Sequence, residues 1–161
     1  MKRSLVVLLV LILAVALYAR KPVNFSGKWQ LDMEKSQLAD ARLWLDKIVV
    51  MQTKDSLLTE RTYKTENWDE YPFTENLTLD GAEHEITIYD MPRKAAAGIA
   101  NKKKNIVITS EVTFWGDNGE VTIPNTETWS LTEKGKVLSI DYTTVSQDGQ
   151  VSGKLLFNKA E

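Results

Sequence analysis

The feature that most constrains the fold is a two-residue hydrophobic period that runs along the chain from Phe25 onward. Across residues 25–31, apolar side chains and Gly27 alternate with polar ones, as in a strand with one buried face. Between the periodic segments 73–79 and 83–89, Asp80-Gly81 supplies the positive φ angles that a tight hairpin needs. The chain is therefore predicted to be all-β, built from short strands and turns.

About ten such segments follow one another, nearly all joined by short turns. The predicted strands cover residues 25–31, 47–53, 57–65, 73–79, 83–89, 93–100, 106–115, 120–131, 137–145 and 150–158. Sequential hairpins without long crossovers favour a single antiparallel up-and-down β-barrel of about 8–10 strands, which avoids exposed sheet edges. After the first strand, apolar residues recur at three to four positions, and we predict one short helix over residues 34–44.

Residues 1–19 have the composition of a secretory leader. Lys2 and Arg3 precede an apolar run over residues 5–19, which is shorter than the roughly 18 residues of a typical membrane span. We expect a signal peptide and export to the periplasm or the extracellular space.

The site of leader cleavage stays open at this stage. Ala16 and Ala19 both offer small residues to a signal peptidase, and the alternative is an uncleaved anchor formed by residues 4–19. Membrane contact is expected only through this segment, if it is retained. Residues 23–159 form the predicted barrel domain.

The composition excludes several classes of function. The chain has no cysteine, one histidine and a formal net charge of −2. It therefore lacks a disulfide framework, the ligands of a zinc site and the basic surface of a nucleic-acid-binding protein. His84 has no nearby nucleophile motif such as G-x-S-x-G. We expect no metal, no cofactor, no nucleic-acid partner and no catalysis. An enzyme is therefore the third of the possible functions, after a ligand-binding protein and an interaction module.

The segment Phe25-Ser26-Gly27-Lys28-Trp29 resembles the G-x-W first-strand signature of the calycin superfamily, the lipocalins and fatty-acid-binding proteins. More closely, residues 25–36 resemble the opening of a family of bacterial exported lipocalin-like proteins of uncharacterised function. The likeness continues at Glu127-Thr128-Trp129-Ser130-Leu131 and at Phe157-Asn158-Lys159. It implies a lipocalin-like barrel with an internal cavity.

Two departures from the superfamily limit what the resemblance implies. Lipocalins usually pack an arginine on the first-strand tryptophan, whereas the last strand here offers Lys154 and Lys159. Fatty-acid-binding proteins often hold the ligand carboxylate with an Arg-x-Tyr pair on that strand, where this chain has Lys154-Leu155-Leu156. The resemblance therefore gives no support to a fatty-acid ligand. Trp29 itself is predicted to be a core residue that plugs one end of the barrel.

Polar candidates for a ligand site come from strand parity. Glu127 shares a face with Trp129, and a carboxylate inside a barrel must be paired or protonated. Arg61 and Lys64 are possible partners on opposite faces of one strand, so at most one points inward. Glu127 is either a polar anchor for a ligand or half of a structural ion pair, and a break at Pro124 would reverse its face.

Aromatic side chains are the other candidates, because small-molecule cavities are lined mainly by such groups. The predicted ligand-binding residues are Arg61, Tyr63, Trp115, Glu127, Trp129 and Tyr142. For each aromatic residue the alternative is simple packing of the barrel. The leading hypothesis is an exported binding protein for a small, mostly apolar ligand. The alternative is a packed β-barrel interaction module that contacts an envelope protein, and cavity volume discriminates between the two. The oligomeric state stays open.

Overall fold

The computed structural model describes residues 22–38, 42–116, 119–146 and 149–160, so the predicted leader, residues 1–19, lies outside the described residues. Ten antiparallel strands form one sheet in the order β4-β3-β2-β1-β10-β9-β8-β7-β6-β5. The strands are β1 (Gly27–Leu31), β2 (Leu43–Gln52), β3 (Ser56–Thr65), β4 (Glu70–Thr78), β5 (Asp80–Ile88), β6 (Met91–Ala100), β7 (Asn105–Gly116), β8 (Gly119–Thr132), β9 (Val137–Ser146) and β10 (Gly149–Ala160). The predicted all-β, up-and-down architecture is confirmed.

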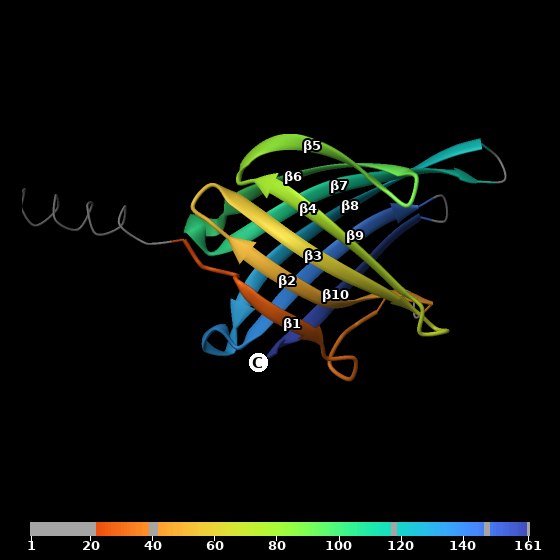
Figure 1. Ribbon diagram of the computed structural model, residues 1–161. Helices are drawn as coiled ribbons and strands as arrows, with labels where there is room; N and C mark the ends of the chain where they lie inside the picture. The colour runs from red at the N-terminus through yellow and green to blue at the C-terminus, as the bar shows by residue number, and fades with distance from the viewer. Residues whose placement is uncertain (1–21, 39–41, 117–118, 147–148, 161) are drawn as a thin grey trace, which may run out of the picture.

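The sheet curls until its first and last strands in sequence, β1 and β10, pair with each other, and β4 and β5 become its two edges. Figure 1 shows the resulting barrel from the side. The β3–β4, β5–β6, β7–β8 and β9–β10 connections gather at one end, which we call the mouth, on the right of the view. The opposite end, which carries the C-terminus, is called the closed end.

The hydrophobic core fills the closed half of the barrel. Its fully buried side chains include Phe25, Trp29, Ile48, Leu57, Ile106, Leu138 and Phe157. The Trp29 indole N–H donates to the Phe25 carbonyl at 2.9 Å, and the Lys159 ammonium lies 5.5 Å from the centre of the Trp29 ring. Trp29 is thus a core residue, as predicted, and Lys159 provides the cation that packs on it.

The predicted helix over residues 34–44 is wrong for the part of it that the structure describes. Residues 33–35 form a turn, in which the Ser36 amide donates to the Asp32 carbonyl at 3.1 Å. Gln37 forms an antiparallel bridge with Lys154, and β2 begins at Leu43. Ala39 and Ala41, on which the prediction depended, lie outside the described residues.

A β-bulge follows directly after this segment. The register between β2 and β3 shifts between Leu45 and Lys47, which breaks the two-residue period. Trp44 and Leu45 are both buried, although they are neighbours on one strand. Trp44 is covered by the Trp68 ring, whose centre lies 6.4 Å away.

Within the described ranges, no helix is both long and apolar enough to span a membrane.

Candidate functional site

Four charged side chains from four strands meet inside the barrel, and we call them the charge layer: Arg61 (β3), Glu75 (β4), Arg93 (β6) and Glu127 (β8). Arg61 Nη1 donates to Glu127 Oε1 at 2.8 Å, and Arg61 Nε lies 3.1 Å from Glu75 Oε1. Arg93 donates twice to Glu75, from Nε at 3.0 Å and from Nη2 at 3.2 Å. The four groups form one continuous chain of ion pairs.

Strand parity places these residues inside. On β3, Leu57, Thr59 and Arg61 share the buried face, and on β4 Glu75 shares it with Leu77. Because every second residue points inward, a charged residue at such a position is buried by the register of its strand. Its charge must then be compensated by partners from other strands.

Two further donors bind the Glu127 carboxylate besides Arg61. The Trp129 indole N–H donates to Oε2 at 2.8 Å, and Asn125 Nδ2 donates to Oε1 at 3.2 Å. Thr144 in turn donates its hydroxyl to Asn125 Oδ1 at 2.9 Å. The Arg61 guanidinium lies 5.4 Å from the centre of the Trp129 ring, within range of a cation–π interaction.

Glu127 and Arg61 keep their charges despite burial. Burial raises the pKa of Glu127, but the charge of Arg61 and the hydrogen bonds from Arg61 and Trp129 outweigh it, so the pKa lies below its ordinary value. Burial by itself lowers the pKa of Arg61, and the carboxylates of Glu127 and Glu75 more than reverse this, so its pKa is raised. Burial also raises the pKa of the neighbouring Tyr63 phenol.

Side chains, rather than backbone hydrogen bonds, join the two edges of the sheet. Strands β4 and β5 are not neighbours in the hydrogen-bonded order, and the Glu75–Arg93 ion pair connects β4 to β6 across this seam. Nearer the mouth, the Tyr89 hydroxyl donates to the Pro72 carbonyl at 2.6 Å, and the Tyr71 and Tyr89 rings meet edge to face. The charge layer therefore also helps to close the barrel.

The buried polar atoms without a hydrogen-bond partner among the described residues include Arg61 Nε, Arg61 Nη2, Thr59 Oγ1 and Ser110 Oγ. Of these, Arg61 Nε still lies 3.1 Å from Glu75 Oε1, in an ion pair, whereas no ion pair of Nη2 is found among the described residues. Arg61 and Thr59 are almost completely inaccessible to solvent. Thr59 is paired in register with Glu75, so its hydroxyl lies beside the charge layer. Buried polar groups are nearly always hydrogen-bonded, and each exception calls for an explanation.

Between the charge layer and the mouth, the inward-facing side chains are mainly apolar and only half-buried. On β7 and β8 these are Val112, Phe114, Val121 and Ile123, which continue the inward faces of Ile108 and Glu127. Tyr63 and Phe73, also half-buried, stack with their ring centres 6.0 Å apart. Their counterparts in the closed half, such as Ile108, are fully buried. Apolar surface inside the barrel is thus left partly uncovered on the mouth side.

The structure brings together some of the predicted site residues. Arg61, Glu127 and Trp129 are in direct contact. Tyr63 follows Arg61 on the inward face of β3, and Tyr142 is paired in register with Glu127. Trp115 is not part of this group, because its side chain is 81% exposed and it is Phe114 that continues the inward face of β7. Whether any of them binds a ligand stays a prediction.

Sequence reasoning missed Glu75 and Arg93, although the same signal was present. Glu75 lies between Phe73 and Leu77 in an alternating segment, and Arg93 shares the parity of Ala95 and Ala97. Both were therefore identifiable as inward-facing charges. Their pairing across the seam was not, because it depends on how far the sheet curls.

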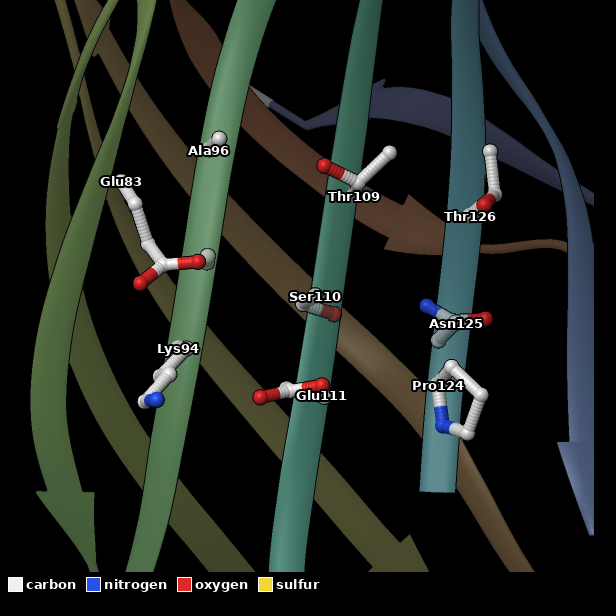
Figure 2. Close-up of a pocket in the computed structure, with 10 residues that line it drawn as sticks. Glu83, Lys94, Ala96, Thr109, Ser110, Glu111, Pro124, Asn125 and Thr126 are labelled. Carbon is white, nitrogen blue, oxygen red and sulfur yellow. The ribbon is translucent and has the colours of Figure 1, made fainter. Parts of the chain in front are cut away.

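A shallow hollow of about 210 Å³ lies on the outer face of the β5–β8 sheet. In Figure 2, Thr109, Glu111, Pro124 and Thr126 lie in front of the ribbon, whereas Ser110 and Asn125 point behind it. Ligand cavities usually measure about 300–1,000 Å³, so this hollow is smaller than most of them. It also lies on the opposite side of the sheet from the charge layer.

No group of three or more potential metal ligands occurs among the residues described. His84 Nε2 accepts a hydrogen bond from the Thr78 amide at 3.2 Å and lies 2.9 Å from the Thr78 hydroxyl. The ring is thus held by the turn that joins β4 to β5.

Comparison with known proteins gives one structural likeness. No protein-family model and no curated protein matches the sequence. Among solved structures, the zebrafish ileal bile acid-binding protein complexed with cholic acid aligns with a TM-score of 0.49 and 14% identity, over 84% of this chain and 98% of that chain. At these values the likeness identifies no ligand for this chain. It also leaves the resemblance to bacterial exported proteins a prediction.

Proposed function

We propose that this protein binds a small, mostly apolar ligand in the mouth half of the barrel, with a polar group of the ligand directed at Arg61. The observation that carries the proposal is Arg61 Nη2, a buried cationic donor without a partner among the described residues. Leaving a buried donor unsatisfied costs about 1–3 kcal/mol, and more for a charged group. A ligand acceptor at this atom would remove that cost.

The surroundings of Arg61 fit such a ligand. The charge layer forms a polar floor, and the half-buried side chains above it provide an apolar wall that includes Phe73, Phe114 and Ile123. Covering this wall would contribute roughly 25 cal/mol per Å² of apolar surface removed from water. The Arg61 side chain is held by Glu75 and Glu127, so its free donor keeps a fixed direction.

We also propose that the protein is exported and has no catalytic activity. This part rests on the sequence of residues 1–19, with two basic residues before an apolar run. N-terminal sequencing of the protein from cell fractions of its host tests it. A mature chain that begins after Ala16 or Ala19 in an extracytoplasmic fraction is the expected result, and an intact N-terminus in a soluble cytoplasmic fraction would contradict it.

The decisive experiment is native mass spectrometry of the protein purified from its own host, followed by denaturing extraction. A reproducible extra mass, released as one compound on denaturation, is the expected result. Saturable binding of the neutral fluorophore N-phenyl-1-naphthylamine provides a second measurement that does not depend on a retained ligand. A bare mass after gentle handling, together with no saturable fluorophore binding, would overturn the proposal.

A pair of variants tests the role of Arg61. Arg61→Met combined with Glu127→Gln removes one charge of each sign, so the interior stays neutral while the free donor is lost. It should weaken the binding of the compound identified by mass spectrometry at least about tenfold, since the lost donor carries a full charge. Glu60→Gln, at an exposed position on the outer face of the same strand, is the matched control and should leave affinity unchanged.

The alternative is a packed barrel that contacts an envelope protein through its surface. It is favoured by exposed aromatic side chains near the mouth, among them Trp68, Tyr89 and Trp115. This alternative predicts the bare mass and the absence of fluorophore binding. It also predicts that Trp115→Ser weakens a defined complex without changing the stability of the free protein.

A further inference from the structure

The inventory of charges in the interior restricts the kind of polar group that a ligand can carry. The charge layer holds two guanidinium groups and two carboxylates, so its formal net charge is zero. The remaining buried charged residue among those described is Asp46, which forms its own ion pair with Lys64 at 3.1 Å. No uncompensated cation is therefore found among the buried side chains described.

The free hydrogen-bonding capacity of the layer lies on the donor side. Glu127 already accepts from Arg61, Asn125 and Trp129. Glu75 is held by Arg93 through both of its oxygens and lies against Arg61. Arg61 Nη2, by contrast, is unpartnered among the described residues. A ligand group that meets Arg61 Nη2 must be an acceptor, because a guanidinium nitrogen only donates.

We infer that this acceptor is uncharged: the barrel selects apolar molecules with a hydroxyl, carbonyl or ester group over the corresponding carboxylates. The inference rests on the proposed function and specifies its ligand class. An ionised carboxylate would lose its hydration and add a negative charge to a layer that is already neutral, next to Glu75 and Glu127. A neutral acceptor requires only the one hydrogen bond that Nη2 offers, and it leaves the existing ion pairs in place.

The test compares three ligands that share a ten-carbon chain: decan-1-ol, methyl decanoate and decanoate. Each is used at pH 7.5 to displace N-phenyl-1-naphthylamine from the full chain. We expect both neutral ligands to displace the fluorophore at concentrations at least about tenfold lower than decanoate. Decanoate that binds as tightly as the neutral ligands would overturn the inference and leave the proposed function standing. Absence of saturable fluorophore binding, together with a bare mass in native mass spectrometry, is the separate result that removes the proposed function, and the inference with it.

A charge variant provides an independent readout of the same idea. Glu127→Gln gives the layer a formal charge of +1, so the preference for decan-1-ol over decanoate should shrink or reverse. Asp141→Asn removes a carboxylate from the outer surface and should keep the wild-type preference. An unchanged preference in folded Glu127→Gln would contradict the inference. The comparison of three ligands on the wild-type chain decides it if that variant does not fold.

Discussion

Replacing Glu127 by Gln tests whether the charge layer is as tightly coupled as its geometry indicates. The Glu127 and Arg61 side chains are 5% and 0% exposed, and their contacting atoms lie 2.8 Å apart. Removing one partner of a buried ion pair costs about 3–5 kcal/mol, because the other charge stays buried and loses compensation. The amide carbonyl that the substitution introduces would keep one donor, from Arg61 or from Trp129, so we expect a loss in this range rather than above it.

The assay is urea denaturation followed by fluorescence, with Asp141→Asn as the control. Lys154 and Asp141 form an ion pair of 3.0 Å, but their side chains are 47% and 51% exposed, so the control should lose at most about 1 kcal/mol. Arg61→Met added to Glu127→Gln restores a neutral interior and should recover part of the loss. A loss below about 1 kcal/mol for Glu127→Gln, or one equal to that of the control, would refute the reasoning.

Three further outcomes are expected. The pKa of Glu127 lies below its ordinary value of about 4.5 in the folded chain, so the ionised side chain stabilises the fold fully above that pH and loses this effect in acid. The difference in the free energy of unfolding between wild type and Glu127→Gln should therefore narrow from pH 7 to pH 3 in parallel denaturation curves. Gly153→Ala would place a Cβ 2.5 Å from the Gln37 carbonyl oxygen and should lower the free energy of unfolding by about 1–3 kcal/mol. Gly98→Ala is the control, because open space surrounds its Cβ position, and it should change the free energy of unfolding little. Equal effects of the two substitutions would contradict the close contact at Gly153. Thr59→Val removes an unpartnered buried hydroxyl and should leave the melting temperature unchanged or raised, so a clear decrease would reveal a missed partner.

The sequence predicts the barrel because the same signal recurs in nearly every strand. The prediction fails over the described part of residues 34–44, a segment in which apolar residues three to four positions apart and two alanines indicated a helix. A bulge after Leu45 interrupts the alternation, and Trp44 is buried on the outer face under Trp68. A short apolar segment without a two-residue period cannot be assigned to helix or strand by periodicity alone.

The sequence predicts which residues of the candidate site point into the barrel, but not which of them touch one another. Parity on β8 indicates that Glu127 points inward, and parity on β3 leaves Arg61 or Lys64 as its partner; the structure selects Arg61. The same parity, applied to β7, would have placed Phe114 inside and Trp115 outside. The contact between β3 and β8 itself is not local information, because these strands are not neighbours in the sheet and meet only through its curvature.

Stability alone does not explain why the interior contains four charges. Well-packed apolar residues in place of buried ion pairs are often neutral or stabilising, so the layer needs another reason to exist. Two carboxylates hold the Arg61 guanidinium through Nε and Nη1. Its third nitrogen, Nη2, has no partner among the described residues and is therefore a donor held in a fixed position. Glu127→Gln should then reduce stability and alter ligand preference together, whereas Thr59→Val should leave the fold intact. If the ligand preference is unchanged after Glu127→Gln, the role of the charge layer is instead to close the seam between β4 and β6 through Glu75 and Arg93.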